Sequence, residues 1–338
     1  MADTFKFRID HHGSLVRPPE LLAARRQHEE GTLGADGLRA VEDRAIADVV
    51  KAQRRLNLSV VTDGEFRRED VRSAVFDRVA GFRRAGSGWA ADGELKADGP
   101  LIAEEVAAVA AQTWIAAKAT LPSPAYLAGR CFAEGTSYKS ARELGDALAE
   151  IIRAEIELLI FRGIRYIQLD NPDYAAHLLG GADAALSLDD AIAVDTRAVG
   201  LPDKPDNVRV GLCPVRAADG QVDEGVAARL FERVPVDRWI LPYCAGTQAE
   251  TRLLRAVPAD RDVCLGVVDP DRPELEDIDV IMDRMDAVAG LRDIEDVAVS
   301  PRAGFSEVAG RAALGFEEQR RKLTHVETIA RMCWGNEL

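Results

Sequence analysis

The chain has 338 residues, of which 47% are hydrophobic and 30% are charged. This length is enough for one large hydrophobic core, and a barrel of this size can form a single domain. The formal net charge of −14, with a pI near 5.0, argues against nucleic acid or an anionic membrane surface as a partner. We therefore expect a small-molecule substrate, and a homo-oligomer is compatible with the composition.

The cysteines and the N-terminal residues give expectations about the compartment. The five cysteines are widely spaced and no CxxC pair occurs, so neither a disulfide framework nor a compact zinc knuckle is predicted. The stretch MADTFKFRID lacks the apolar centre of a signal peptide, and no apolar run reaches the ~18 residues of a membrane span. A cytoplasmic protein with reduced thiols is expected.

Short β-rich runs alternate with long helical patterns along the chain. Most of the runs are apolar at consecutive positions, as in parallel strands that are covered on both faces. The predicted strands, in chain order, cover residues 7–14, 58–66, 114–122, 165–172, 208–213, 238–244, 263–269 and 297–305. Helical spacing of apolar residues separates them, for example over 38–57, 141–163 and 277–290.

Eight strands with intervening helices predict an α/β fold of the (β/α)8 barrel type. A doubly wound sheet is the alternative, and the absence of GxGxxG after the first strand counts against its dinucleotide-binding form. The glycine-rich stretch 81–100 interrupts the alternation. We interpret it as an inserted hairpin or lid within about residues 75–110. No linker divides residues 1–338, so one domain is predicted.

Polar residues concentrate where the predicted strands end, which is where barrels of this type build their sites. Glu65 and Asp170 end apolar strands, and this placement suits a group that holds an ammonium ion or accepts a proton. The alternative is that each pairs with a neighbouring arginine in a structural network. Other polar residues at such positions are Ser14, Arg17, Asp63, Arg67, Asn171, Cys213, Arg216, Cys244, Asp269, Asp271, Arg272, Arg302 and Ser306.

Two adjacent histidines and one cysteine have several possible roles. Successive residues of a strand point to opposite faces, so at most one of His11 and His12 can face the barrel mouth. A hydrogen-bonded structural histidine is the simpler reading, and a metal or acid–base role is the alternative. Cys213, at the end of a predicted strand, could be a metal ligand, a nucleophile or a core thiol.

Several of these stretches resemble the catalytic C-terminal domain of cobalamin-independent methionine synthases. The similarity extends from about residue 7 to residue 335, and its landmarks occur in the family's order. They are DHHGSLVRPPELLAAR (10–25), VVTDGEFRRED (60–70), LPSPAYL (121–127), YIQLDNPDYAA (166–176), LGVVDPDRPELED (265–277) and VAVSPRAGF (297–305). The resemblance implies a (β/α)8 barrel of the methionine synthase/uroporphyrinogen decarboxylase type.

The resemblance also implies a chemistry and a substrate site. In that family, zinc binds homocysteine as a thiolate, which takes a methyl group from a folate. Serine, glutamate and aspartate side chains hold the amino-acid part, and they match Ser14, Glu65 and Asp170. With the neighbouring Asn171, these residues form the predicted substrate-binding set.

The metal-binding end departs from the family pattern. Three of the implied zinc ligands fall on Gly211, Pro242 and Ala303, and the fourth is Cys213. Zinc sites use at least three protein donors, and glycine, proline and alanine side chains supply none. No cofactor is therefore expected. The family's acid–base histidine falls near Asp271.

Two further readings concern what replaces the metal. A rebuilt zinc site from Cys213, Cys244 and either His11 or His12 is the alternative to a metal-free protein. Arginines at the vacated positions could instead clamp a carboxylate, phosphate or developing oxyanion. These are Arg216, after Cys213, and Arg302, before Ala303. In the opposing interpretation, the two arginines only hold loops by pairing with Asp219, Asp269 or Asp271.

The sequence thus predicts a metal-independent transferase or lyase that acts on a small amino-acid-like or carboxylate-bearing substrate. Arg216 and Arg302 would stabilise anionic charge, and Asp271 or Cys213 would transfer a proton or act as nucleophile. Zinc-dependent methyl or alkyl transfer to a thiol such as homocysteine is the first alternative. A non-catalytic binding protein is the second.

Overall fold

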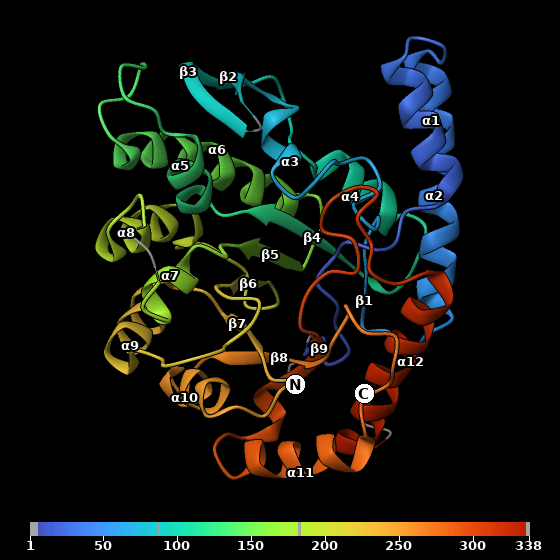
Figure 1. Cartoon of the computed structure of the whole chain (residues 1–338), viewed down its shortest axis with the longest axis vertical. Coiled ribbons are helices and arrows are strands. Elements are labelled where there is room, and N and C mark those ends of the chain that lie inside the picture. Colours follow the sequence, from blue (N-terminus) through green and yellow to red (C-terminus); the bar gives the residue numbers. More distant parts are fainter. Residues whose placement is uncertain (1–5, 87, 182–183, 336–338) are drawn as a thin grey trace.

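The computed structural model describes residues 6–86, 88–181 and 184–335. Within them, parallel strands form one curled sheet of seven strands, in the order β1-β4-β5-β6-β7-β8-β9 (Figure 1). The strands are β1 (Val60–Val61), β4 (Ala116–Pro122), β5 (Tyr166–Asp170), β6 (Arg209–Cys213), β7 (Arg238–Pro242), β8 (Asp262–Val268) and β9 (Val297–Pro301). The fold is the predicted α/β barrel.

An eighth segment lies between the two edges of this sheet. Ile9 forms a parallel bridge with Val299 of β9, and its carbonyl oxygen accepts a hydrogen bond of 3.0 Å from the backbone N–H of Ser59, next to β1. The strand predicted over 7–14 is therefore reduced to this bridge. The backbone N–H of His11 bonds the Asp10 carboxylate instead of a strand, and Gly13 has a φ of 124°.

Helices follow the strands and cover the outside of the sheet (Figure 1). Several begin at a residue whose side chain accepts an N–H of the first turn, which satisfies a group that the helix leaves free. Examples are Ser140, Ser187 and Thr247. The helices are α1 (Pro19–Glu29), α2 (Ala35–Arg54), α3 (Ser73–Phe76), α4 (Ala103–Ala110), α5 (Pro124–Cys131), α6 (Ala141–Phe161), α7 (Tyr174–Leu178), α8 (Leu188–Val199), α9 (Glu224–Arg233), α10 (Gln248–Ala256), α11 (Ile278–Ala289), η1 (Ile294–Asp296) and α12 (Phe316–Trp334).

Side chains of one face of the strands form layers inside the barrel, because alternate residues of a strand share a face. On β5 these are Tyr166, Gln168 and Asp170, all buried. Lys118 of β4 is in register with Tyr166, and Cys213 of β6 is in register with Asp170. The register therefore places Lys118 deep in the barrel, and Asp170 and Cys213 at the carboxyl end of the strands.

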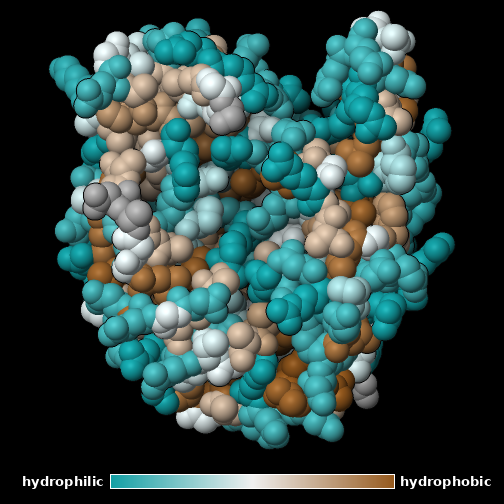
Figure 2. Space-filling model, viewed as in Figure 1, coloured by the Kyte–Doolittle hydropathy of each residue, from teal (hydrophilic) through white to brown (hydrophobic). Residues whose placement is uncertain are grey.

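The glycine-rich stretch forms an antiparallel hairpin of β2 (Val79–Ala85) and β3 (Gly88–Ala97). Phe76 of α3 holds it, since its ring stacks on Trp89 with a centroid distance of 4.8 Å. The hairpin and α1 project on the same side of the molecule, with a notch between them (Figures 1 and 2). Hydrophilic residues cover most of the face in Figure 2. No helix in the described ranges is long and apolar enough to cross a membrane.

Candidate functional site

A pocket of about 210 Å³ lies at the carboxyl ends of the strands. Four side chains of the predicted site line it: Ser14, Glu65, Asp170 and Arg216. They come from four separate segments of the chain, which the closure of the barrel brings together. The other lining residues are His12, Asp70, Val71, Arg72, Tyr126, Pro172, Gly304, Glu307 and Val308.

The backbone at Glu65 is held in an unusual conformation. Glu65 has a φ of 59° and follows Gly64 at 70°, and a left-handed conformation of a non-glycine residue costs about 1–3 kcal/mol. Its N–H donates to Asp63 Oδ1 at 2.8 Å and its carbonyl oxygen accepts from Arg17 Nη2 at 2.9 Å. Such strain is typical of functional positions, and here it directs a carboxylate to the pocket.

The Glu65 carboxylate is buried and has no ion pair within the described ranges. Thr120 donates a hydrogen bond of 2.9 Å to Oε1. Burial raises the pKa of this carboxyl, and the charges of Arg68 and Arg17 offset only part of the effect. A Cβ atom at position 13 would lie 3.0 Å from Glu65 Oε1, so Gly13 leaves the carboxylate its room. The group can therefore accept a cation from a ligand.

Arg216 is the central cation of the other side of the pocket. Its Nη2 lies 3.3 Å from Asp170 Oδ2 and 3.1 Å from Glu307 Oε1. Its Nη1 lies 2.6 Å from His12 Nδ1 and 3.7 Å from Cys213 Sγ. One guanidinium thus connects four segments at the mouth of the barrel. Its carboxylate partners differ from all three aspartates of the loop-holding alternative.

The contact with Arg216 fixes the protonation of His12. A guanidinium can only donate, so Nδ1 must accept and the ring proton lies on Nε2. Burial lowers the pKa of His12 well below its ordinary value, and the charge of Arg216 adds to this effect. The ring is therefore neutral. Its Nε2 is buried and has no hydrogen-bond partner in the described ranges, which leaves one unused N–H donor on a residue that lines the pocket.

Arg302 has a different environment. Its guanidinium lies 2.9 Å from Asp269 and also pairs with Asp271, whose side chain is 59% exposed. Neither Arg302 nor Asp271 lines the pocket described above. These contacts match the interpretation in which the arginine holds the loops after β8 and β9.

Two other predicted site residues, Cys213 and Asn171, are in environments that do not suit their predicted roles. Burial raises the pKa of the Cys213 thiol to about 12, so the sulfur is protonated near neutral pH and is no ready nucleophile. The Asn171 amide donates to Ser123 Oγ and Asp195 Oδ2, both at 3.0 Å. Tyr174 donates to the same Asp195 carboxylate at 2.9 Å. Asn171 thus faces a buried network and the neighbouring pocket of about 390 Å³ beside α7.

The residues at the family's metal positions do not fit a zinc ion. Gly211, Pro242 and Ala303 have no donor side chain. A Cβ atom at Gly211 would already lie 3.3 Å from Ile240 and 3.5 Å from Tyr166, so the space for a histidine there is filled.

The rebuilt set considered above is not assembled either. His11 Nε2 contacts Gln53 of α2 at 3.0 Å, and Cys244 belongs to no group of potential ligands among the described residues. A different trio has donor atoms within 4.8 Å of one another: His12, Asp170 and Cys213. Arg216 contacts all three of them.

Several lining residues were not among the predicted site residues, and two of them, Glu307 and Gly304, shape the contacts described above. Glu307 follows β9 in the same loop as Arg302, so its strand-end position was a usable signal. Gly304 allows this loop to approach Ser14, since a Cβ atom there would lie 2.0 Å from Ser14 Oγ. A lone glycine in a loop carries no such signal.

The fold and site together define a (β/α)8 barrel with a small-molecule pocket at the carboxyl ends of its strands. Residues 12–331 match the family described as "Cobalamin-independent synthase, Catalytic domain". The chain belongs to this family, as the resemblance predicts.

Individual relatives agree with this assignment. The uncharacterized protein YxjH of Bacillus subtilis is 27% identical, over 97% of this chain and 95% of its own. A methionine synthase of Pyrococcus furiosus is 24% identical, over 87% of this chain and 84% of its own. A solved structure from Listeria monocytogenes, provisionally named a vitamin-B12 independent methionine synthase, superimposes with a TM-score of 0.81 at 25% identity, covering 98% of both chains.

Proposed function

We propose that this protein is a metal-independent transferase or lyase of the family, and that its substrate is a small amino acid. The observation that carries this proposal is the position of Arg216. A guanidinium lies among His12, Asp170 and Cys213, next to a pocket whose opposite wall keeps an unpaired carboxylate. A permanent organic cation thus stands where the family's chemistry calls for a metal.

The charges of the pocket favour a ligand with an amino group. Its arginines are already paired, Arg72 with Asp70 and Arg216 with Asp170 and Glu307. Glu65 is left as the acid without a counterion. An ammonium group placed against it would recover the free energy that burial of the carboxylate costs. Ser14 lines the same pocket and supplies a hydroxyl.

The other end of the ligand would meet donors and not a metal. The charge of Arg216 is shared between two carboxylates, so this residue positions its neighbours and does not itself clamp an anion. The free Nε2–H of His12 is the group that can donate to a ligand oxygen or sulfur. Methionine synthases among the relatives, such as that of Pyrococcus furiosus, make thiol and thioether amino acids the first compounds to test.

Binding is tested by calorimetry with L-homocysteine, L-methionine and the des-amino analogue of methionine. Glu65→Gln should weaken the two amino acids about tenfold or more, the value of a buried charged hydrogen bond. The same variant should leave the des-amino analogue unaffected. The matched control is Glu274→Gln, an exposed glutamate. If Glu65→Gln and the native protein bound methionine with equal affinity, Glu65 would not be the group that binds the ammonium.

Turnover is tested in the presence of EDTA, with product detection by mass spectrometry. Product formation that persists in EDTA supports the metal-independent enzyme. Product that forms only with added zinc supports zinc-dependent transfer to a thiol. A ligand that raises the melting temperature without any product supports a non-catalytic binding protein.

The location of the protein in the cytoplasm and its assembly into a homo-oligomer remain predictions from the sequence.

A further inference from the structure

The His12, Asp170 and Cys213 side chains form a trio of the kind that binds zinc. Imidazole nitrogen, carboxylate oxygen and thiolate sulfur are its ordinary protein ligands. All three residues are buried, and Asp170 and Cys213 are held in register by adjacent strands. The trio shares only Cys213 with the ligand positions that the family resemblance implies. It is therefore a different arrangement from the inherited one.

Each member of the trio is in contact with the same guanidinium. Arg216 Nη1 reaches His12 Nδ1 and Cys213 Sγ, and Nη2 reaches Asp170 Oδ2. The contact at His12 Nδ1 uses the lone pair that a metal would need at that atom. A divalent cation next to Arg216 would also meet its positive charge at short range. Metal and guanidinium are thus mutually exclusive at this position.

The donor atoms of the trio are close enough together to reach one zinc ion after a small movement. Ligands bound to zinc at about 2.0–2.3 Å in a tetrahedron lie about 3.3–3.8 Å from each other. The donor atoms of the trio all lie within 4.8 Å of one another. A contraction of at most about 1 Å would therefore close them around zinc, which is within reach of ordinary rotamer adjustments. Glu307, a partner of Arg216 at 3.1 Å, adds a fourth donor nearby.

We propose that Arg216 occupies a latent metal site and that its guanidinium keeps divalent metals out of it. Removal of this one side chain converts His12, Asp170 and Cys213 into a zinc-binding trio. Which substrate the pocket takes makes no difference to this role of Arg216. The role extends the proposed function, because it names the residue that makes the barrel metal-independent.

The experiment compares metal binding by purified full-length variants. The test variants are Arg216→Ala and Arg216→Gln, and the second keeps a polar group in case the first does not fold. The double variant Arg216→Ala/Cys213→Ser reports on the thiol. The matched control is Arg302→Ala, which removes an arginine from the end of β9, outside the trio. Circular dichroism and thermal melting verify that each variant is folded.

Zn²⁺ and Co²⁺ are the probes. Zinc is measured by competition with a chromophoric chelator, and cobalt by its thiolate charge-transfer absorption. The native protein and Arg302→Ala should bind no zinc under competition and give no thiolate band. Arg216→Ala or Arg216→Gln should bind about one equivalent with the band, and the double variant should lose the band.

Two results would overturn the proposal, and they differ in what they mean for the function. Folded Arg216 variants that bind no more zinc than the native protein would exclude a latent site but leave metal-independent catalysis intact. A native protein that binds zinc through Cys213 would contradict both.

Discussion

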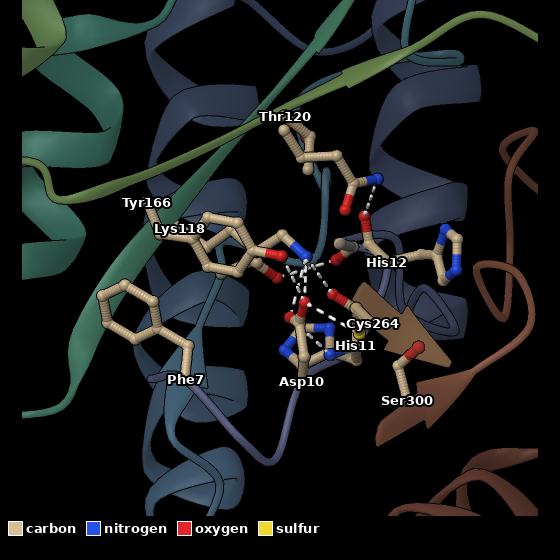
Figure 3. Close-up of polar contacts among 12 residues, drawn as sticks. Phe7, Asp10, His11, His12, Lys118, Thr120, Tyr166, Cys264 and Ser300 are labelled. Atoms are coloured by element: carbon tan, nitrogen blue, oxygen red, sulfur yellow. Dashed lines mark hydrogen bonds and ion pairs between the residues drawn. The ribbon is translucent and has the colours of Figure 1, made fainter. Parts of the chain in front are cut away.

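Two buried ionic clusters of the barrel differ in their position: one lies deep in its interior and the other lies at its mouth. In the deep cluster, Lys118 Nζ lies 2.7 Å and 2.9 Å from the two oxygens of Asp10 and 2.7 Å from the carbonyl oxygen of His11. Tyr166 also donates to Asp10, at 2.6 Å. Figure 3 shows these groups converging on Asp10, while the ring of His12 points away from them.

Each cluster is built around one cation, and the two cations differ in their exposure and in their access to the pocket. Lys118 is fully buried and all three of its donor positions are used. Arg216 is 21% exposed, borders the pocket and leaves His12 Nε2 unpartnered. The deep cluster, whose lysine is fully paired, joins the N-terminal segment to β4 and β5. The cluster at the mouth includes His12 and Arg216, which line the pocket where a ligand would bind. We infer that the first serves stability and the second serves function.

The largest expected effect comes from breaking the deep cluster. Lys118→Met leaves Asp10 buried without its counterion, which should lower the free energy of unfolding by about 3–5 kcal/mol. Arg216→Gln should cost less, about 1–2 kcal/mol, because Asp170 keeps a hydrogen bond from Gln168 and Glu307 is half-exposed. Urea denaturation of both variants measures the difference. Equal losses of unfolding free energy in the two variants would contradict the inference that the deep cluster serves stability more than the cluster at the mouth.

The next effect concerns pH. Burial and the charge of Lys118 lower the pKa of His11 to about 4. The unfolded chain therefore binds a proton near pH 6.5 that the folded protein takes up only near pH 4, and stability falls as the pH decreases between these values. The expected loss from His11 is about 3 kcal/mol by pH 4. It is absent above pH 6.5.

Asp10 acts in a lower window. Burial alone raises the pKa of its carboxyl, but the charge and hydrogen bond of Lys118, with help from Tyr166, lower it overall. Its contribution is thus present above the ordinary aspartate range and lost below it. His11→Gln should flatten the pH dependence between pH 7 and 5, as measured by denaturation at each pH. An unchanged slope in this variant would exclude His11 as its source.

A smaller and more local effect is expected at the mouth. Gly304→Ala brings a Cβ atom against Ser14 Oγ, so the loop after β9 must move away from the pocket. Ligand affinity should fall more than stability does, which calorimetry and thermal melting can separate. Gly34→Ala is the control, since nothing lies within 4 Å of that position. A variant with native affinity would show that the loop does not shape the pocket.

The sequence was sufficient for the barrel because each strand is a short apolar run followed by polar residues. The same rule located Ser14, Glu65 and Asp170, since the strand ends of a closed sheet meet at one face. The short pairing at Ile9, which closes the barrel between β9 and β1, was harder to predict from the sequence. Its segment is polar on both sides, and its pairing is limited to a single bridge.

The roles of the arginines could not be predicted from sequence. Arg216 and Arg302 both follow strand ends with acids nearby, and a long flexible side chain can reach several of them. The structure pairs one with Asp170 and the other with Asp269. Which histidine faces the mouth also depended on where the Ile9 bridge ends, a feature of tertiary structure.

The most direct test of the account is anomalous diffraction at the zinc edge, from crystals of the native protein grown with zinc. The guanidinium of Arg216 should lie between His12, Asp170 and Cys213, with no anomalous peak among them. A strong peak within bonding distance of Cys213 Sγ, with Arg216 displaced, would contradict the claim that an arginine has taken the place of the metal in this barrel.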